Sequence, residues 1–224
     1  MKQAFVVGST GLVGNILLEK LLSNRNFSSV SVLVRKNSGR IHDKLTEHVI
    51  DFGKIETLGN LMKTDVLFCC LGSTIKKAGS KEAFKKVDLE YVAELARIAE
   101  RNRIRKFIVI SSVGAHPFSR NFYLRTKGEM ELMVMACEIE QKHFIRPGLI
   151  LGHRKEFRFG EWLAALLSPL FMPLLSGSWK KYRPVSADAI ASCMLHLALV
   201  DESTEIIENE LIEKFSELQL KDYL

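Results

Sequence analysis

Three glycines spaced three residues apart, Gly8, Gly11 and Gly14, most constrain what this chain can fold into. An apolar run at residues 4–7 predicts a buried strand before them, and apolar periodicity from Leu12 predicts a helix after them. A dinucleotide pyrophosphate needs this combination, because backbone must approach the phosphates and helix N–H groups must face them. The spacing is G-x-x-G-x-x-G instead of G-x-G-x-x-G. The stretch alone therefore does not exclude the alternative that it is a purely structural turn.

Strand and helix signals alternate along the whole chain. Strands are expected at residues 4–7, 30–34, 48–50, 65–71, 106–110, 143–146 and near 206–212. Helices are expected from residue 12, at 81–101, at about 123–140 and at 187–200, with a broken helix near 161–175. This order predicts an α/β fold, a Rossmann-like doubly wound parallel sheet of six or seven strands with helices on both faces.

Length and charge narrow the function classes. The 224 residues can bury a full core, so we expect residues 1–224 to form a single dinucleotide-binding Rossmann domain. Segments at about 150–185 and 200–224 would add a small substrate-binding portion. The net charge is +6, but no basic stripe is interleaved with aromatic residues. Nucleic-acid binding is therefore not favoured, and an anionic small ligand suits the charge equally well.

The cysteine and histidine spacings predict no metal site. No C-x-x-C occurs, and the six histidines never pair at metal-ligand spacing. The chain starts with Met-Lys-Gln directly before the first strand, so we expect no signal peptide. We therefore expect reduced thiols and a cytoplasmic location.

The longest apolar stretch, residues 162–175, is interrupted by Ser168, Pro169 and Pro173. It is too short and too broken to span a bilayer, so we expect a packed helix and no membrane association. A dimer face, a substrate lid and a membrane-touching surface stay open as alternatives. We expect a monomer or a homodimer.

The carboxyl ends of the first four strands carry candidate cofactor contacts. Arg35 follows the second strand, where an NAD site would usually have Asp or Glu, and a guanidinium there can clamp a 2′-phosphate. Asp51 and Phe52 could bind and cover an adenine ring, although Asp51 could equally be only a turn former. Residues 71–74 offer small side chains beside the cofactor, or a simple glycine turn.

The strongest catalytic signal combines Ser111 and Ser112, at the end of the fifth strand, with Tyr123 and Lys127. Tyrosine and lysine at positions i and i+4 share one helix face. A neighbouring ammonium favours the ionised form of a phenol, so tyrosine can exchange a proton with a carbonyl or hydroxyl. A serine hydroxyl opposite would orient the same oxygen.

Several segments carry a family resemblance. They are Gly8-Ser9-Thr10-Gly11-Leu12-Val13-Gly14, Cys69-Cys70-Leu71-Gly72-Ser73-Thr74, Lys86-Val87-Asp88, Phe122-Tyr123-Leu124-Arg125-Thr126-Lys127-Gly128-Glu129, Phe144-Ile145-Arg146-Pro147-Gly148 and Gly160-Glu161-Trp162-Leu163. Together they resemble the atypical short-chain dehydrogenase/reductases, and more narrowly the Tat-interactive oxidoreductase family and its NmrA-like relatives. The likeness runs from residue 4 to about 195.

The resemblance implies roles for individual residues. Ser112, Tyr123 and Lys127 would be catalytic, with Ser111 as the nearest alternative to Ser112. The implied cofactor contacts are Gly8, Thr10, Gly11, Leu12, Val13, Gly14, Arg35, Asp51, Phe52, Leu71, Gly72, Ser73, Ser111, Tyr123, Lys127, Pro147, Gly148 and Leu149. In many relatives the fourth catalytic residue is an asparagine on the helix before the tyrosine helix. It has no clear equivalent here, because Asp88 or Glu90 occupies that region.

The implied function is an NADP(H)-preferring oxidoreductase, with NAD(H) possible as the cofactor, acting on a small carbonyl or alcohol. A non-catalytic redox sensor of the NmrA type is the alternative, and a nucleotide-sugar epimerase is a weaker one. Glu129 and Glu131 are expected to be solvated helix charges. Residues 153–162 are expected either to recognise substrate or to form a surface loop.

Overall fold

One parallel sheet organises the molecule. The computed structural model describes residues 1–152 and 182–221. The strands of the sheet are β1 (Lys2–Val7), β2 (Phe27–Val34), β3 (Leu45–Val49), β4 (Val66–Cys69), β5 (Lys106–Ile110), β6 (Gln141–Arg146) and β9 (Ile206–Glu208). Their order is β3-β2-β1-β4-β5-β6-β9, and every neighbouring pair is parallel. The direction of strand addition reverses between β1 and β4, which is where such sheets bind ligands.

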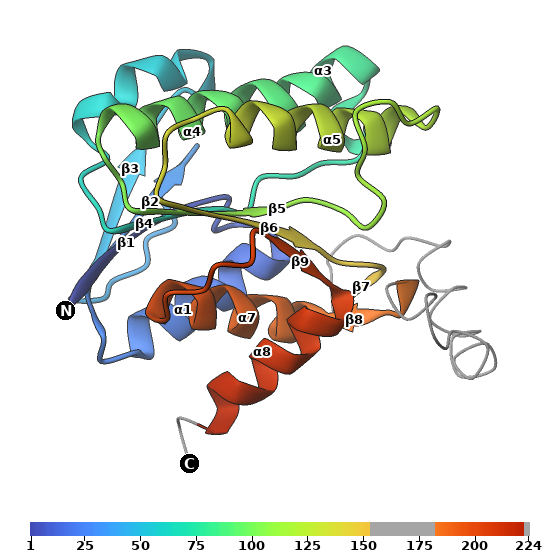
Figure 1. The fold of residues 1–224 in the computed structure, drawn as a ribbon. Coiled ribbons are helices and arrows are strands. Elements are labelled where there is room, and N and C mark those ends of the chain that lie inside the picture. Colours follow the sequence, from blue (N-terminus) through green and yellow to red (C-terminus); the bar gives the residue numbers. More distant parts are fainter. Residues whose placement is uncertain (153–181, 222–224) are drawn as a thin grey trace.

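Helices cover both faces of the sheet (Figure 1). One face carries α1 (Leu12–Ser23), α7 (Ala187–Leu199) and α8 (Asn209–Lys221). The other carries α3 (Lys81–Lys85), α4 (Tyr91–Arg101) and α5 (Phe122–Met135). The expected doubly wound sheet, with seven strands, is confirmed.

Alternation along the strands builds the two cores. In β1, Ala4 and Val6 pack with the α1 and α7 side chains, whereas Phe5 and Val7 pack with those of α4. Successive strand side chains point to opposite faces, so a strand covered on both sides must be apolar at every position. This explains the continuous apolar runs in the sequence.

Some element boundaries differ from expectation. The strand expected near 206–212 ends at Glu208, and α8 begins at Asn209, because Ile212 and Phe215 are buried at helical spacing. The helix expected to reach residue 140 ends at Met135, since β6 already begins at Gln141. The broken helix expected near 161–175 lies outside the described residues.

Four short elements were not anticipated. They are a 3₁₀ segment η1 (Phe52–Asn60), a helical turn α2 (Ile75–Ala78) and the pair β7 (Ile150–Leu151) and β8 (Val185–Ser186). In addition, the helix expected over 81–101 contains a π-helical turn, η2 (Lys86–Glu90), in which the Tyr91 N–H bonds the carbonyl of Lys86.

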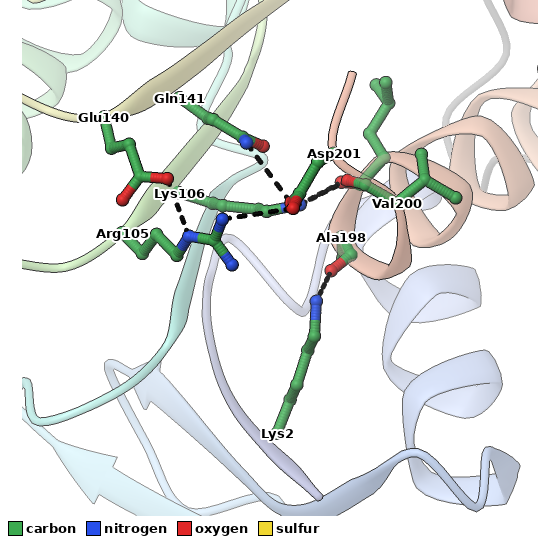
Figure 2. Close-up of polar contacts among 9 residues, drawn as sticks. Lys2, Arg105, Lys106, Glu140, Gln141, Ala198, Val200 and Asp201 are labelled. Carbon is green, nitrogen blue, oxygen red and sulfur yellow. Dashed lines mark hydrogen bonds and ion pairs between the residues drawn. The ribbon is translucent and has the colours of Figure 1, made fainter. Parts of the chain in front are cut away.

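Along the amino-terminal edge of the sheet, the side on which the parallel strands begin, two lysines bind the end of α7 (Figure 2). Lys2 Nζ lies 2.5 Å from the Ala198 carbonyl oxygen. Lys106 Nζ donates to the carbonyls of Leu197, at 3.2 Å, and Val200, and it pairs with Asp201 at 3.2 Å. The ammonium groups thus satisfy carbonyls that a helix end leaves without partners.

Candidate functional site

The glycine turn brings the end of β1 against the end of β4. Gly8 has φ +89°, and a Cβ there would lie 2.6 Å from the carbonyl carbon of Cys70. A Cβ on Gly14 would lie 2.2 Å from the Gly8 carbonyl oxygen, so the first turn of α1 also needs a glycine. These close approaches explain the spacing of the glycines.

The start of α1 fits an anionic group. Gly11 caps the helix without a side-chain hydrogen bond, and no acidic side chain lies in the first turn. The positive end of the helix dipole is therefore not neutralised by carboxylates of its own first turn. Together with the crowded glycine cradle, this makes the turn fit a dinucleotide pyrophosphate.

Arg35, Asp51 and Phe52 follow the two strands at the β3 end of the sheet. Arg35 is exposed and makes no ion pair with any residue that the structure describes. Asp51 caps η1, accepting a hydrogen bond from the Gly53 N–H at 2.9 Å. The Phe52 ring lies 5.8 Å from the ring of Tyr91. For Asp51, then, the structure gives a turn-forming contact, and its predicted adenine contact stays a prediction.

Asp88 connects the loop after β4 with α5. Its carboxylate is fully buried; Oδ2 accepts the Ser73 N–H at 2.9 Å, and Oδ1 lies 2.8 Å from Lys127 Nζ. Lys127 Nζ also donates to the Ile110 carbonyl at 3.3 Å. Lys127 is thus held between the end of β5 and the carboxylate of Asp88. The sequence pointed only to the region of Asp88 and not to this contact.

Charge at Lys127 is favoured despite burial. Burial alone would lower the pKa of Lys127, but Asp88 and the Tyr123 phenol raise it, and the net direction is upward. The nearby Cys69 thiol stays neutral, because burial raises its pKa to about 12. The ring of Tyr123 is half-buried, with its centroid 5.5 Å from that of Phe84.

The two serines after β5 have different surroundings. The buried Ser111 hydroxyl donates to Glu131 Oε1 at 2.5 Å. Ser112 is half-buried and donates to the Val113 carbonyl at 3.3 Å. Among the residues that the structure describes, no carboxylate holds the hydroxyl of Ser112, unlike that of Ser111.

Glu131 is not the solvated helix charge that we expected. Its side chain is 4% exposed and binds Arg146 through two contacts, Nε to Oε1 at 2.9 Å and a second nitrogen to Oε2 at 2.5 Å. Residues 123, 127 and 131 are spaced by four along α5, so Glu131 shares the inward face of Tyr123 and Lys127. That spacing was the available signal. Glu129, in contrast, forms a partly exposed pair with Lys85.

The segment after β6 is anchored through its backbone. The Pro147 carbonyl accepts from the Val113 N–H at 3.0 Å, and the Leu149 carbonyl from the Val185 N–H at 2.8 Å. The Gly148 N–H donates to Oδ1 of the buried Asn209 at 3.2 Å. Asn209 in turn donates to the Arg183 carbonyl. Nothing in the sequence around Asn209 indicated this role.

The structure brings part of the predicted site together. Ser73 and Lys127 are linked through Asp88, and Tyr123 lies one turn from Lys127 along α5. Residues 153–162, expected to contact substrate, lie outside the described residues. Within 1–152 and 182–221, no three His, Cys, Asp or Glu side chains gather to hold a metal. Among the helices described, none is both long and apolar enough to cross a bilayer.

Comparison with known proteins gives relatives over most of the chain. The sequence profile of a family described as NAD(P)H-binding matches residues 8–150. Protein HTATIP2 of Rattus norvegicus is 33% identical over 217 residues, which cover 94% of this chain and 88% of that protein. The protein named "FMP52, mitochondrial" of Debaryomyces hansenii is 32% identical over 201 residues, 87% of each. With a relative of that name, the cytoplasmic location expected here stays a prediction.

Solved structures share the fold. The oxidoreductase ylbE from Lactococcus lactis has a TM-score of 0.66 at 20% identity and covers 98% of this chain and 97% of its own. The Bordetella bronchiseptica enzyme WbmH, in complex with NAD+, has a TM-score of 0.66 at 16% identity, covering 92% of this chain and 74% of its own.

Proposed function

Because the chain belongs to the NAD(P)H-binding family, we propose that it is an oxidoreductase of the atypical short-chain dehydrogenase/reductase type that prefers NADPH. Its substrate would be a small carbonyl or alcohol. The glycine turn of Gly8, Gly11 and Gly14 would hold the pyrophosphate, and Arg35 would bind the 2′-phosphate.

One observation carries the proposal. Lys127, buried and paired with Asp88 at 2.8 Å, lies one helical turn from Tyr123 on the inward face of α5. A buried ammonium beside a half-buried phenol supports proton exchange with a bound substrate. A protein that only bound the dinucleotide would not need this pair.

The chain's own side chains divide the remaining work. When bound, the dinucleotide would supply or accept the hydride at the substrate carbon. The Tyr123 hydroxyl would give a proton to the substrate oxygen in reduction and take one in oxidation, while the Ser112 hydroxyl bonds the same oxygen. Lys127 has three N–H groups; one donates to the Ile110 carbonyl while the ammonium pairs with Asp88, which leaves an N–H for Tyr123 or a ribose hydroxyl.

Turnover tests this proposal directly. Purified protein with NADPH and a panel of aldehydes, ketones and quinones should lose absorbance of the reduced nicotinamide. Tyr123→Phe should lower kcat by at least about a hundredfold, because general acid–base catalysis contributes that much, while the Kd for NADPH stays within twofold. Glu129→Gln, on the surface of α5, is the control and should keep full activity. Normal turnover by Tyr123→Phe would refute its role, and binding without turnover on the whole panel would favour a redox sensor.

Cofactor preference rests on Arg35. Arg35→Asp should weaken NADPH binding by about tenfold or more while leaving NADH binding unchanged or improved, because a carboxylate repels the 2′-phosphate and suits a 2′-hydroxyl. Arg25→Asp, at the other end of β2, makes the same charge change as a control. Equal loss of NADPH affinity in both variants would contradict a specific contact.

A further inference from the structure

A carboxylate buried beside the proposed catalytic lysine has no role in the function stated so far. Asp88 lies in the π-helical turn η2, and its side chain is 0% exposed. It contacts two other elements, the Ser73 N–H of the loop after β4 and the Lys127 ammonium of α5. A single side chain thus joins the loop expected beside the cofactor to the proposed catalytic helix.

Packing alone does not explain this pair. Removing two charges from water costs several kcal/mol per ion, and apolar side chains of similar volume often stabilise a protein as well or better. A buried ion pair is therefore weak evidence of a purely stabilising role. Lys127 lies one helical turn from Tyr123, where the proposed chemistry needs its ammonium to remain protonated and fixed in place. The negative charge of Asp88 can serve that purpose.

We propose that Asp88 is a positioning residue of the active site, which keeps the Lys127 ammonium charged and directs it between the Ser73 loop and Tyr123. This inference rests on the proposed oxidoreductase function. Asp88 acts through Lys127 and does not itself touch substrate.

The groups that face Lys127 all favour its charge or are neutral. Asp88 approaches from η2, the Tyr123 phenol from α5 itself, the neutral Cys69 thiol from β4 and the Ile110 carbonyl from β5. Among these, Asp88 supplies the full negative charge. Asp88→Asn keeps an oxygen that can accept the Ser73 N–H but removes that charge, so burial would act on Lys127 with much less opposition.

Lys127 titration measures the proposal without substrate. Lysine labelled with ¹³C at Cε gives one NMR resonance per side chain, and a Lys127→Arg variant assigns the resonance of Lys127. In the wild type, the midpoint of the Lys127 titration should lie above the ordinary lysine value of 10.5. In Asp88→Asn its midpoint should fall by at least about one pH unit, equivalent to a tenfold change in the proton affinity.

Kinetics supply the second measurement. Asp88→Asn should lower kcat, and the alkaline limb of its pH–rate profile should move to lower pH by the same shift as the Lys127 midpoint. The Kd for NADPH should change by less than about threefold, since the bond to Ser73 persists. Asp88→Glu, which keeps the charge, should restore the high Lys127 midpoint and part of kcat.

The matched control is Glu131→Gln, which removes another buried carboxylate, this one on α5 itself and one turn beyond Lys127. It should leave the Lys127 midpoint unchanged. An unchanged midpoint in Asp88→Asn, or an equal shift in Glu131→Gln, would overturn the proposal. If Asp88→Asn does not fold, a wild-type Lys127 midpoint below 10.5 would overturn the proposal. A wild-type midpoint above 10.5, with an equally high midpoint in Asp88→Glu, would support the proposal. Failure of the oxidoreductase function would instead appear as wild-type protein without turnover.

Discussion

Lys127 and Lys106 are both buried lysines, at opposite edges of the same sheet, and their environments differ. Lys127 pairs with Asp88, which is 0% exposed, and its pKa is raised. Lys106 is 1% exposed but binds helix carbonyls and Asp201, whose side chain is 61% exposed (Figure 2). Burial lowers the pKa of Lys106, and its partners do not reverse the direction.

The difference teaches how the protein uses a buried charge. A carboxylate shielded from water acts at a low effective dielectric constant, whereas an exposed one is screened by water and salt. The amino-terminal edge uses ammonium groups to complete the end of α7, which is a structural task. At the carboxyl-terminal edge, buried carboxylates pair with cations beside the candidate site and favour their charged forms.

The largest effect is expected at the carboxyl-terminal edge. Within residues 1–152 and 182–221, Glu131→Gln leaves Arg146 with Glu208 as its remaining charged partner, at 3.3 Å. Breaking such a buried pair should lower the free energy of unfolding by about 3 kcal/mol. Urea denaturation measures the loss, with Glu129→Gln as the exposed control on the same helix. Equal losses in both variants would mean that the buried pair contributes no more than a surface one.

Lys106→Met should have a smaller effect on stability. It removes the ammonium from the carbonyls of Leu197 and Val200 and leaves them without that donor. We expect a loss of about 1–3 kcal/mol in the free energy of unfolding, and no change in the Kd for NADPH, because the site lies at the other edge. Lys63→Met, an exposed lysine, is the control. A weakened NADPH affinity would break the separation of the two edges.

Acid should destabilise the protein through His143. Burial lowers the pKa of His143 below its ordinary value of 6.5, while Nδ1 bonds the Thr204 carbonyl. Within the described residues, Nε2 has no hydrogen-bond partner. The unfolded chain therefore binds the proton first, and stability present above pH 6.5 is lost as the pH falls below it. The slope of unfolding free energy against pH between 6.5 and 5 should become smaller in His143→Leu. An unchanged slope would assign the acid sensitivity to other groups.

The smallest effect is expected for Asp201→Asn. Hydrogen bonds from Lys106 and Gln141 lower the pKa of Asp201 to about 2, so its contribution is present above its ordinary value of 3.8 and lost as the pH falls through about 2. Because the side chain is exposed, salt should screen the contribution. The urea midpoint at pH 7 should fall less than in Lys106→Met, and the difference from wild type should shrink in 0.5 M NaCl. A salt-independent difference would contradict this account.

The fold could be predicted from the sequence because its signals are local. The glycines, the alternating apolar runs and the helix periodicity each lie within a few residues, and their order defines a doubly wound sheet. The family resemblance drawn from the same motifs is confirmed by the relatives. The predicted end of the last strand, near residue 212, was wrong. Over so short a window, Ile206, Ile207, Leu211 and Ile212 suit a strand or a helix equally well.

The charged parts of the site could be predicted only incompletely. Tyr123 and Lys127 are four residues apart, so their common face follows from the sequence. Asp88 and Lys127 are far apart along the chain, and Glu131 and Arg146 belong to different elements. Whether such carboxylates are solvated or buried depends on tertiary packing, which a single sequence does not reveal. Asn209 was missed for the same reason.

The π-helical turn at η2 has an evolutionary consequence. A turn that bonds residue i to i+5 holds one residue more than an α-helical turn, so loss of one residue here would restore a regular helix. Related chains that lack the extra residue would carry a straight helix here, with residues on one side of the gap rotated by about 100°. In such chains the position equivalent to Asp88 would no longer face the lysine. A gap of one residue between 86 and 91 should therefore separate chains with this carboxylate from chains that position the lysine by other means.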